Sequence, residues 1–140
     1  MKHFEFLEHT ADIIVKGTGD TPEEAFEAAA EGMFSVISDI NKVEAKDKKE
    51  FKVESIDREG LLVAFLSRLI YLHEVDHFVI KQCSVSFQSE NMLKAVVRGE
   101  KFDDSRHEHG MHVKAVSYHM LEIVNGKSGE PSYVQVLIDV

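Results

Sequence analysis

The chain has 140 residues, a formal net charge of −9 and a hydrophobic fraction of 44%, which is ordinary for a globular protein. The acidic balance argues against a protein that neutralises many phosphates, so we expect no direct, tight nucleic-acid binding. The sequence has no apolar run of about 18 residues and no signal-peptide pattern, and its one cysteine, Cys83, fits a reducing cytoplasm. We expect one cytoplasmic domain over residues 1–140 and no association with a membrane.

The first half of the sequence predicts two strands, a helix, an edge strand and a second helix. Short apolar runs at 4–7 and 11–16 indicate the first two strands. Thr21, Pro22 and Glu24 form the start signal of a helix that reaches about Ser38. Residues 51–55 alternate like an edge strand. A second helix runs from an N-cap at Asp57 to about residue 73, and its wide apolar arc predicts that it is the more buried of the two.

The second half predicts four strands, over residues 78–88, 92–102, 112–124 and 133–140. Gly99 is a candidate β-bulge in the second of these strands, and polar stretches at 103–110 and 125–131 predict loops. The element order is therefore ββαβα followed by four strands. It indicates an α+β fold with two helices packed on a mainly antiparallel or mixed sheet.

Two single carboxylates, Asp12 and Asp139, stand on apolar strands, and Val140 carries the carboxylate of the last residue in the sequence. If the last strand lies beside the second, these three groups converge. Oxygen ligands in that number suit calcium or magnesium. Alternatively, the two aspartates are separate, solvated strand-end residues.

A histidine-rich run, His107-Glu108-His109-Gly110-Met111-His112, is a second candidate site. Its imidazoles could bind zinc or nickel, and Glu108 would be the base of a metal-dependent hydrolase. The alternative is a solvated polar loop that is dispensable for function.

Lys114 stands among apolar residues of a predicted strand and is a candidate partner for a phosphate or carboxylate group. The alternative is a lysine that extends from a half-exposed sheet into solvent. Strand alternation places His119 on the opposite face, so the two side chains share a site only if a bulge intervenes. Cys83 occupies a core-facing position and is a poor nucleophile candidate.

Several runs resemble one family, in order along the chain: HTAD at 9–12, TPEEAF at 21–26, GEKFD at 99–103, RH at 106–107, VKAVSYH at 113–119 and VLIDV at 136–140. Together they are similar to the archease family. The resemblance implies a small cytosolic activator of the GTP-dependent tRNA-splicing ligase, which promotes guanylylation and multiple turnover of the ligase and broadens its nucleotide use. It also implies that the chain is not itself an enzyme.

The resemblance further implies a calcium ion held by Asp12, Asp139 and the terminal carboxylate of Val140, and a functionally important lysine at Lys114. We group His119 with Lys114 as a candidate functional or partner-contacting residue. The expected partner is the catalytic subunit of the ligase. Two alternatives stay open, a metal-dependent hydrolase that uses the His107–His112 loop and a metal-free, chaperone-like binding module.

Overall fold

The computed structural model describes residues 1–7 and 12–140. Its elements in chain order are β1 (His3–Leu7), β2 (Ile13–Gly19), α1 (Pro22–Ile37), the 3₁₀ turn η1 (Ile40–Lys42), β3 (Asp47–Glu54), α2 (Arg58–Asp76), β4 (Phe78–Ser89), β5 (Met92–Lys101), β6 (Ala115–Val124) and β7 (Ser132–Asp139). This order is the one that the sequence predicts. No helix among the described residues has the length and apolar character needed to cross a bilayer.

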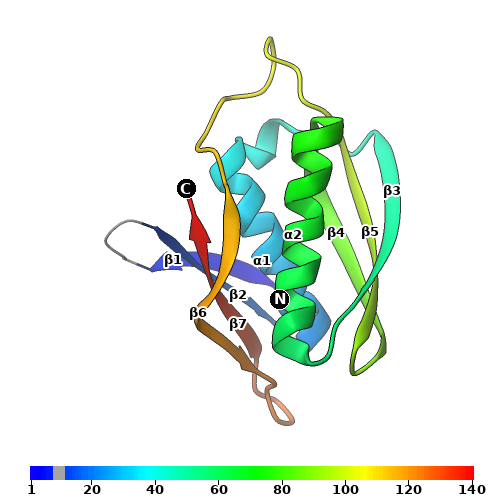
Figure 1. Ribbon diagram of the computed structural model, residues 1–140, viewed down its shortest axis with the longest axis vertical. Helices are drawn as coiled ribbons and strands as arrows, with labels where there is room; N and C mark the ends of the chain where they lie inside the picture. The colour runs from blue at the N-terminus through cyan, green and yellow to red at the C-terminus, as the bar shows by residue number, and fades with distance from the viewer. Residues whose placement is uncertain (8–11) are drawn as a thin grey trace.

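The strands form two antiparallel sheets, one with the order β1-β2-β7-β6 and the other with the order β3-β5-β4. Figure 1 shows the two helices between these sheets. Helix α1 contacts strands of both sheets, and α2 packs against β6 of the first and against β3 and β4 of the second. The fold is therefore α+β with a shared core between the layers, and β3 is an edge strand as predicted.

Local sequence signals account for both helix starts. The Thr21 hydroxyl accepts a hydrogen bond from Glu24 N–H at 3.1 Å, and the Asp57 carboxylate accepts one from Gly60 N–H at 2.7 Å. These bonds satisfy donors that the first helical turn leaves without a partner. The α2 helix ends at Asp76, three residues beyond the predicted end, because His77 adopts the left-handed conformation at φ 56° that closes a helix.

The expectation that the second helix is the more buried one is wrong. Every residue of α1 is at least half-buried, whereas α2 exposes one side that includes Tyr71 and Val75. The reason lies in the packing, because α1 contacts three strands of the first sheet and β4 of the second, whereas α2 packs on β6 of the first sheet and keeps one side in solvent. Gly17 permits the close approach, since a Cβ atom there would lie 2.5 Å from the backbone of α1.

Two strand predictions also need correction. The predicted strand over 112–124 begins only at Ala115, and its pairing with β7 shifts between Ser117 and Glu122, where Met120 has a φ of 62°. The irregularity predicted at Gly99 lies on the neighbouring strand instead, between Ile80 and Gln82 of β4. Gly99 lies against this bulge so closely that a Cβ atom at residue 99 would be 1.9 Å from the Val79 carbonyl oxygen.

Candidate functional site at one end of the first sheet

The inner strand β7 pairs with both β2 and β6 and brings the candidate residues to one end of the first sheet. Ile13 of β2 pairs with Ile138, so Asp12 comes directly before this last pair of the two strands and Asp139 directly after it. On the other side of β7, Ala115 of β6 pairs with Asp139. Figure 1 shows the C-terminus beside the beginning of β6.

Buried aliphatic side chains set this register. Val136 and Ile138 of β7 are fully buried, and the core includes them together with Val134, as the sequence predicts. A shift by one residue would turn these side chains to solvent. Because side chains alternate along a strand, Asp139 faces away from the core side on which Ile138 lies, and it is half-buried. Val140 is half-buried as well and packs against the core.

Lys114 lies at this same end. Its backbone N–H donates a hydrogen bond to the Asp139 carbonyl oxygen at 2.8 Å. Its side chain is exposed, while the preceding residue, Val113, is 3% exposed and belongs to the core. Among the described residues the Lys114 ammonium makes no ion pair. The backbone of Lys114 is therefore fixed, while its side-chain ammonium is exposed and can contact an anionic group.

The residues at this end fit an oxygen-binding cation by chemical kind. Asp12 and Asp139 offer carboxylate oxygens, the ligands that calcium and magnesium prefer. Within residues 1–7 and 12–140, no three histidine, cysteine, aspartate or glutamate side chains gather to hold a metal ion. A cation here would thus take two side-chain carboxylates and complete its shell with a terminal carboxylate, backbone oxygens or water. Residues 9–11 of the HTAD run lie outside the described residues.

His119 lies elsewhere on β6. It belongs to the irregular stretch between the two paired parts of the strand, its side chain is exposed, and its N–H donates to the Ser117 hydroxyl at 3.0 Å. The bulge that a shared site requires is present. In the described part of the chain, however, no hydrogen bond or ion pair joins the side chains of His119 and Lys114.

The histidine run does not form one site, and the expectation of a solvated loop is wrong for His107. The His107 side chain is completely buried, its Nδ1 accepts from Asp103 N–H at 2.8 Å, and its Nε2 lies 3.0 Å from Glu100 Oε2. Since Nδ1 accepts, Nε2 carries the hydrogen that is donated to Glu100. His109 instead meets Asp104, and His112 lies 3.8 Å from Glu74. The three imidazoles therefore do not converge, and the structure offers no support for the metal-dependent hydrolase.

Glu100 is the centre of the cluster that holds His107. It is 3% exposed, and its carboxylate accepts hydrogen bonds from Arg106 and His107 and from Glu44 N–H at 2.7 Å. The hydrogen bonds from Arg106, with those from Glu44 N–H and His107, lower the pKa of Glu100 to about 2, although burial opposes them. This cluster ties the start of the 103–114 segment to β5.

Two further histidines, His73 of α2 and the residue that caps this helix, His77, face the loop histidines across a hollow that the sequence analysis missed. A spacing of four residues near a helix end could have indicated that they lie on one side. The prediction for Cys83 is confirmed, because the side chain is buried and burial raises the pKa of its thiol.

Comparison with known proteins agrees with this fold. The model of the archease protein family (MTH1598/TM1083) matches residues 4–140. The archease of Pyrococcus abyssi is 44% identical over 126 residues, which cover 88% of this chain and 89% of the relative. The archease of Methanosarcina mazei is 41% identical over 143 residues, which cover 99% of this chain and 97% of the relative.

Solved structures show the same architecture. The solution structure of protein 1598 of Methanobacterium thermoautotrophicum superimposes with a TM-score of 0.79 at 32% identity and covers all of both chains. A crystal structure of an archease from Thermotoga maritima, described as a possible chaperone, shares the fold with a TM-score of 0.61 at 21% identity, over 96% of this chain and 94% of that one. The family model and the relatives together establish that the chain belongs to the archease family.

Proposed function

We propose that this protein is an accessory activator of the GTP-dependent tRNA-splicing ligase, and not itself an enzyme. It promotes guanylylation and multiple turnover of the ligase catalytic subunit and broadens the ligase's nucleotide use. The observation that supports the proposal is the register of β2, β7 and β6, which brings the backbones of Asp12, Asp139 and Lys114 to one end of the first sheet, in a chain of the archease family. This function also implies a cytoplasmic location, which the single, buried cysteine supports.

The metal part of the proposal is a calcium ion, or magnesium in its place, held by Asp12, Asp139 and the terminal carboxylate of Val140. Such an ion supplies positive charge between carboxylates that otherwise repel one another. The buried β7 strand holds Asp139 and Val140 in place, and a backbone hydrogen bond joins Lys114, which carries an exposed ammonium, to Asp139. An end of the sheet with this charge pattern suits contact with the phosphate-binding surroundings of a ligase active site.

The overall charge of the protein supports a docking partner with a basic surface. With a net charge of −9, the chain is attracted to positive surfaces, and charge complementarity of this kind raises association rates. A ligase that binds RNA and a nucleotide has such a surface around its active site. The acidic protein thus approaches the mouth of that site, with Lys114 and the metal end of the sheet at or near the contact.

A ligation time course with the cognate ligase tests the activator role. We expect this protein to convert a single round of ligation into many rounds, and we expect Asp12→Asn and Asp139→Asn to reduce that effect. The matched control is Asp47→Asn, since Asp47 is an exposed aspartate on β3 in the other sheet. Equal stimulation by all four proteins would refute the site, and no stimulation by the unaltered protein would leave the metal-free, chaperone-like module as the better description.

Calorimetry with calcium tests the metal separately. We expect weaker calcium binding in both Asn variants and in a form with a C-terminal tag, because the tag replaces the Val140 carboxylate by a neutral amide. An N-terminally tagged form is the control. Equal calcium affinity in the two tagged forms would remove Val140 from the ligand set, and equal affinity in Asp12→Asn would remove the site.

A further inference from the structure

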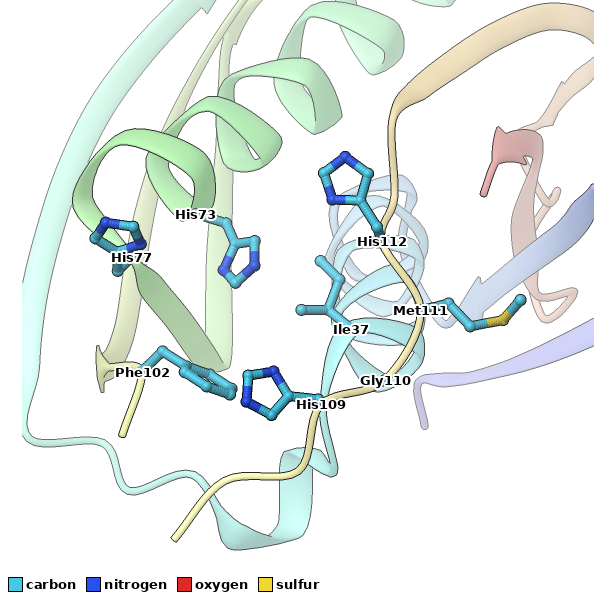
Figure 2. A pocket seen from close by; sticks show the side chains of 8 residues that line it. All are labelled: Ile37, His73, His77, Phe102, His109, Gly110, Met111 and His112. Carbon is cyan, nitrogen blue, oxygen red and sulfur yellow. The ribbon is translucent and has the colours of Figure 1, made fainter. Parts of the chain in front are cut away.

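A hollow of about 260 Å³ lies where the ends of α1 and α2 meet the segment 109–112. Its polar lining consists of four imidazoles, those of His73, His77, His109 and His112. Figure 2 shows rings from α2 and from the 109–112 segment on different sides of the hollow, with Ile37 and Phe102 among them. The hollow therefore has a polar part made of histidine and an apolar part.

The backbone of the 109–112 segment is fixed in this position. Gly110 N–H donates to the Ile37 carbonyl oxygen at 2.8 Å, and Met111 N–H donates to that of Val36 at 2.9 Å. These bonds satisfy carbonyls at the C-terminal end of α1. A Cβ atom at Gly110 would lie 2.2 Å from the Val36 oxygen, so only glycine permits this approach. The wall that carries His109 and His112 is thus a built feature of the fold.

No carboxylate lines this hollow. Three other hollows among the described residues each include acidic side chains, such as Glu27, Glu100 and Glu108. In a chain with a net charge of −9, a hollow lined by imidazoles is a place where an anion meets less repulsion than in the other three, although Asp104 and Glu74 approach two of the rings from outside it.

Two of the four rings are hydrogen-bonded through one nitrogen to groups that do not line the hollow. His73 Nδ1 lies 3.2 Å from the Phe78 carbonyl oxygen, so this nitrogen carries a hydrogen and Nε2 is left for a ligand. His109 Nε2 lies 2.6 Å from Asp104 Oδ1, which leaves Nδ1. His112 Nε2 lies 3.8 Å from a Glu74 oxygen, which is beyond hydrogen-bond distance. The two bonded rings are therefore oriented from outside, and the second nitrogen of each donates to an anion when the ring is protonated.

The spacing of the rings favours an oxyanion over a metal ion. Zinc binds imidazole nitrogens at about 2.0–2.1 Å, so its ligands must converge on one point. No three metal-ligating side chains converge in this way among the described residues. A phosphoryl group instead presents several acceptor oxygens that point in different directions and can be reached by separate donors. The apolar walls at Ile37 and Phe102 can contact the organic part of the same ligand.

We propose that this histidine-lined hollow binds the phosphoryl group of a small phosphate ester, with the organic part of the ester against Ile37 and Phe102. The site shares no residue with the Asp12–Asp139 end of the sheet and goes beyond the proposed function. It gives the protein a second ligand site, located on the segment that leads to Lys114.

The charge of the imidazoles makes this binding depend on pH. Burial lowers the pKa of His73, and the hydrogen bond to the Phe78 carbonyl opposes this effect. Among the charged neighbours, His77 and His112 lower the pKa of His73 further and Glu74 raises it. On the loop side, Asp104 faces His109, and the lining residue of α1, Ile37, carries no charge. A bound dianion favours the protonated rings, so anion affinity rises as the pH falls.

Histidine resonances of the full-length protein, followed by NMR during titration with phenyl phosphate, test the proposal. We expect shifts at the four lining histidines and not at His3, which is exposed on β1. We expect phenyl phosphate to bind about fivefold or more tightly than inorganic phosphate, because its ring buries apolar surface, and we expect phenol to bind negligibly. Equal shifts at His3 would mean non-specific surface binding and would overturn the proposal.

Variants distinguish this site from the chain-end site. The double variant His77→Asn with His112→Gln removes two exposed imidazoles, and asparagine tolerates the left-handed backbone at 77. We expect its affinity for phenyl phosphate to fall about tenfold or more, which corresponds to loss of about one charge-assisted hydrogen bond. His3→Gln is the matched control and Asp12→Asn should also bind normally. Unchanged affinity in the double variant would overturn the proposal.

Sulfate isolates the charge of the protein, because it stays a dianion between pH 6.0 and 7.5. Because a bound anion favours the protonated rings, we expect sulfate to bind several-fold more tightly at pH 6.0 than at pH 7.5. A flat pH profile would contradict the role of the imidazoles and with it the proposal.

Discussion

The segment 103–114 has two parts that look alike in sequence and differ in structure. In the first part, His107 and Arg106 are bonded to the buried carboxylate of Glu100. In the second part, the backbone lies on the end of α1 while His109 and His112 stay exposed at the edge of a hollow. The first part is held to the protein by its side chains, whereas the second is held by its backbone and leaves its side chains exposed.

This difference shows that the role of a histidine depends on the groups packed against it and not on the run in which it occurs. His107 meets a carboxylate from β5, whereas His109 and His112 meet only exposed acidic groups, Asp104 and Glu74. A buried polar group that loses its partner costs more than an exposed one, which remains solvated. The two parts should therefore respond very differently to substitution.

Removal of Glu100 should have the largest effect. Glu100→Ala leaves the buried His107 side chain without its acceptor and Arg106 without its main partner, so we expect the free energy of unfolding to fall by about 3 kcal/mol. Urea unfolding at pH 7 measures this. The control is Glu108→Ala, an exposed glutamate that pairs with Lys42, for which we expect a change within about 0.5 kcal/mol. Equal losses in the two variants would mean that the comparison between the two parts is wrong.

The contribution of Glu100 should also depend on pH. Its pKa is lowered from the ordinary value of 4.5 to about 2 in the folded protein. A lowered carboxyl pKa stabilises the fold fully above the unfolded-state value and progressively less as the pH falls through the range between the two values. We expect the difference between wild type and Glu100→Ala to be constant from pH 7 to about 5 and to shrink below about 4.5. Urea unfolding across this range measures it, and a difference that stays constant down to pH 3 would contradict it.

Two substitutions at His107 should have intermediate effects. His107→Asn can still accept the bond from Asp103 N–H but cannot reach Glu100, and His107→Gln has the reverse limitation. Each loses one buried hydrogen bond, so we expect each to lower the free energy of unfolding by about 1–2 kcal/mol. His112→Gln is the exposed counterpart and should change it by less than about 0.5 kcal/mol. Thermal unfolding compares the three variants. Unchanged stability in both His107 variants would show that the buried hydrogen bonds of His107 contribute nothing to the free energy of unfolding.

Local signals in the sequence were enough for part of this structure. The caps at Thr21 and Asp57 and the buried face of α1 follow from side chains within one or two helical turns. The late start of β6 and the relative burial of the helices depend on contacts distant in sequence, such as that between Gly110 and Ile37. The same limit applied to the sites. Two alternating strands predicted that Asp12 could meet Asp139, but no local pattern connects His107 to Glu100 or His73 to His112.

Lys114→Ala should have the smallest effect on stability and a clear effect on function, which separates the two kinds of role most sharply. The side chain is exposed, and its link to β7 is a backbone hydrogen bond to Asp139 that alanine keeps. We therefore expect the free energy of unfolding to change by less than about 0.5 kcal/mol. If the proposed function is right, activation of the ligase should fall, because the cation beside the two aspartates is lost. Lys127→Ala, on an exposed loop, is the matched control. Multiple-turnover ligation and urea unfolding of both variants decide between the roles: a folded Lys114→Ala that activates fully would exclude the lysine from the site, and an unfolded one would make it structural.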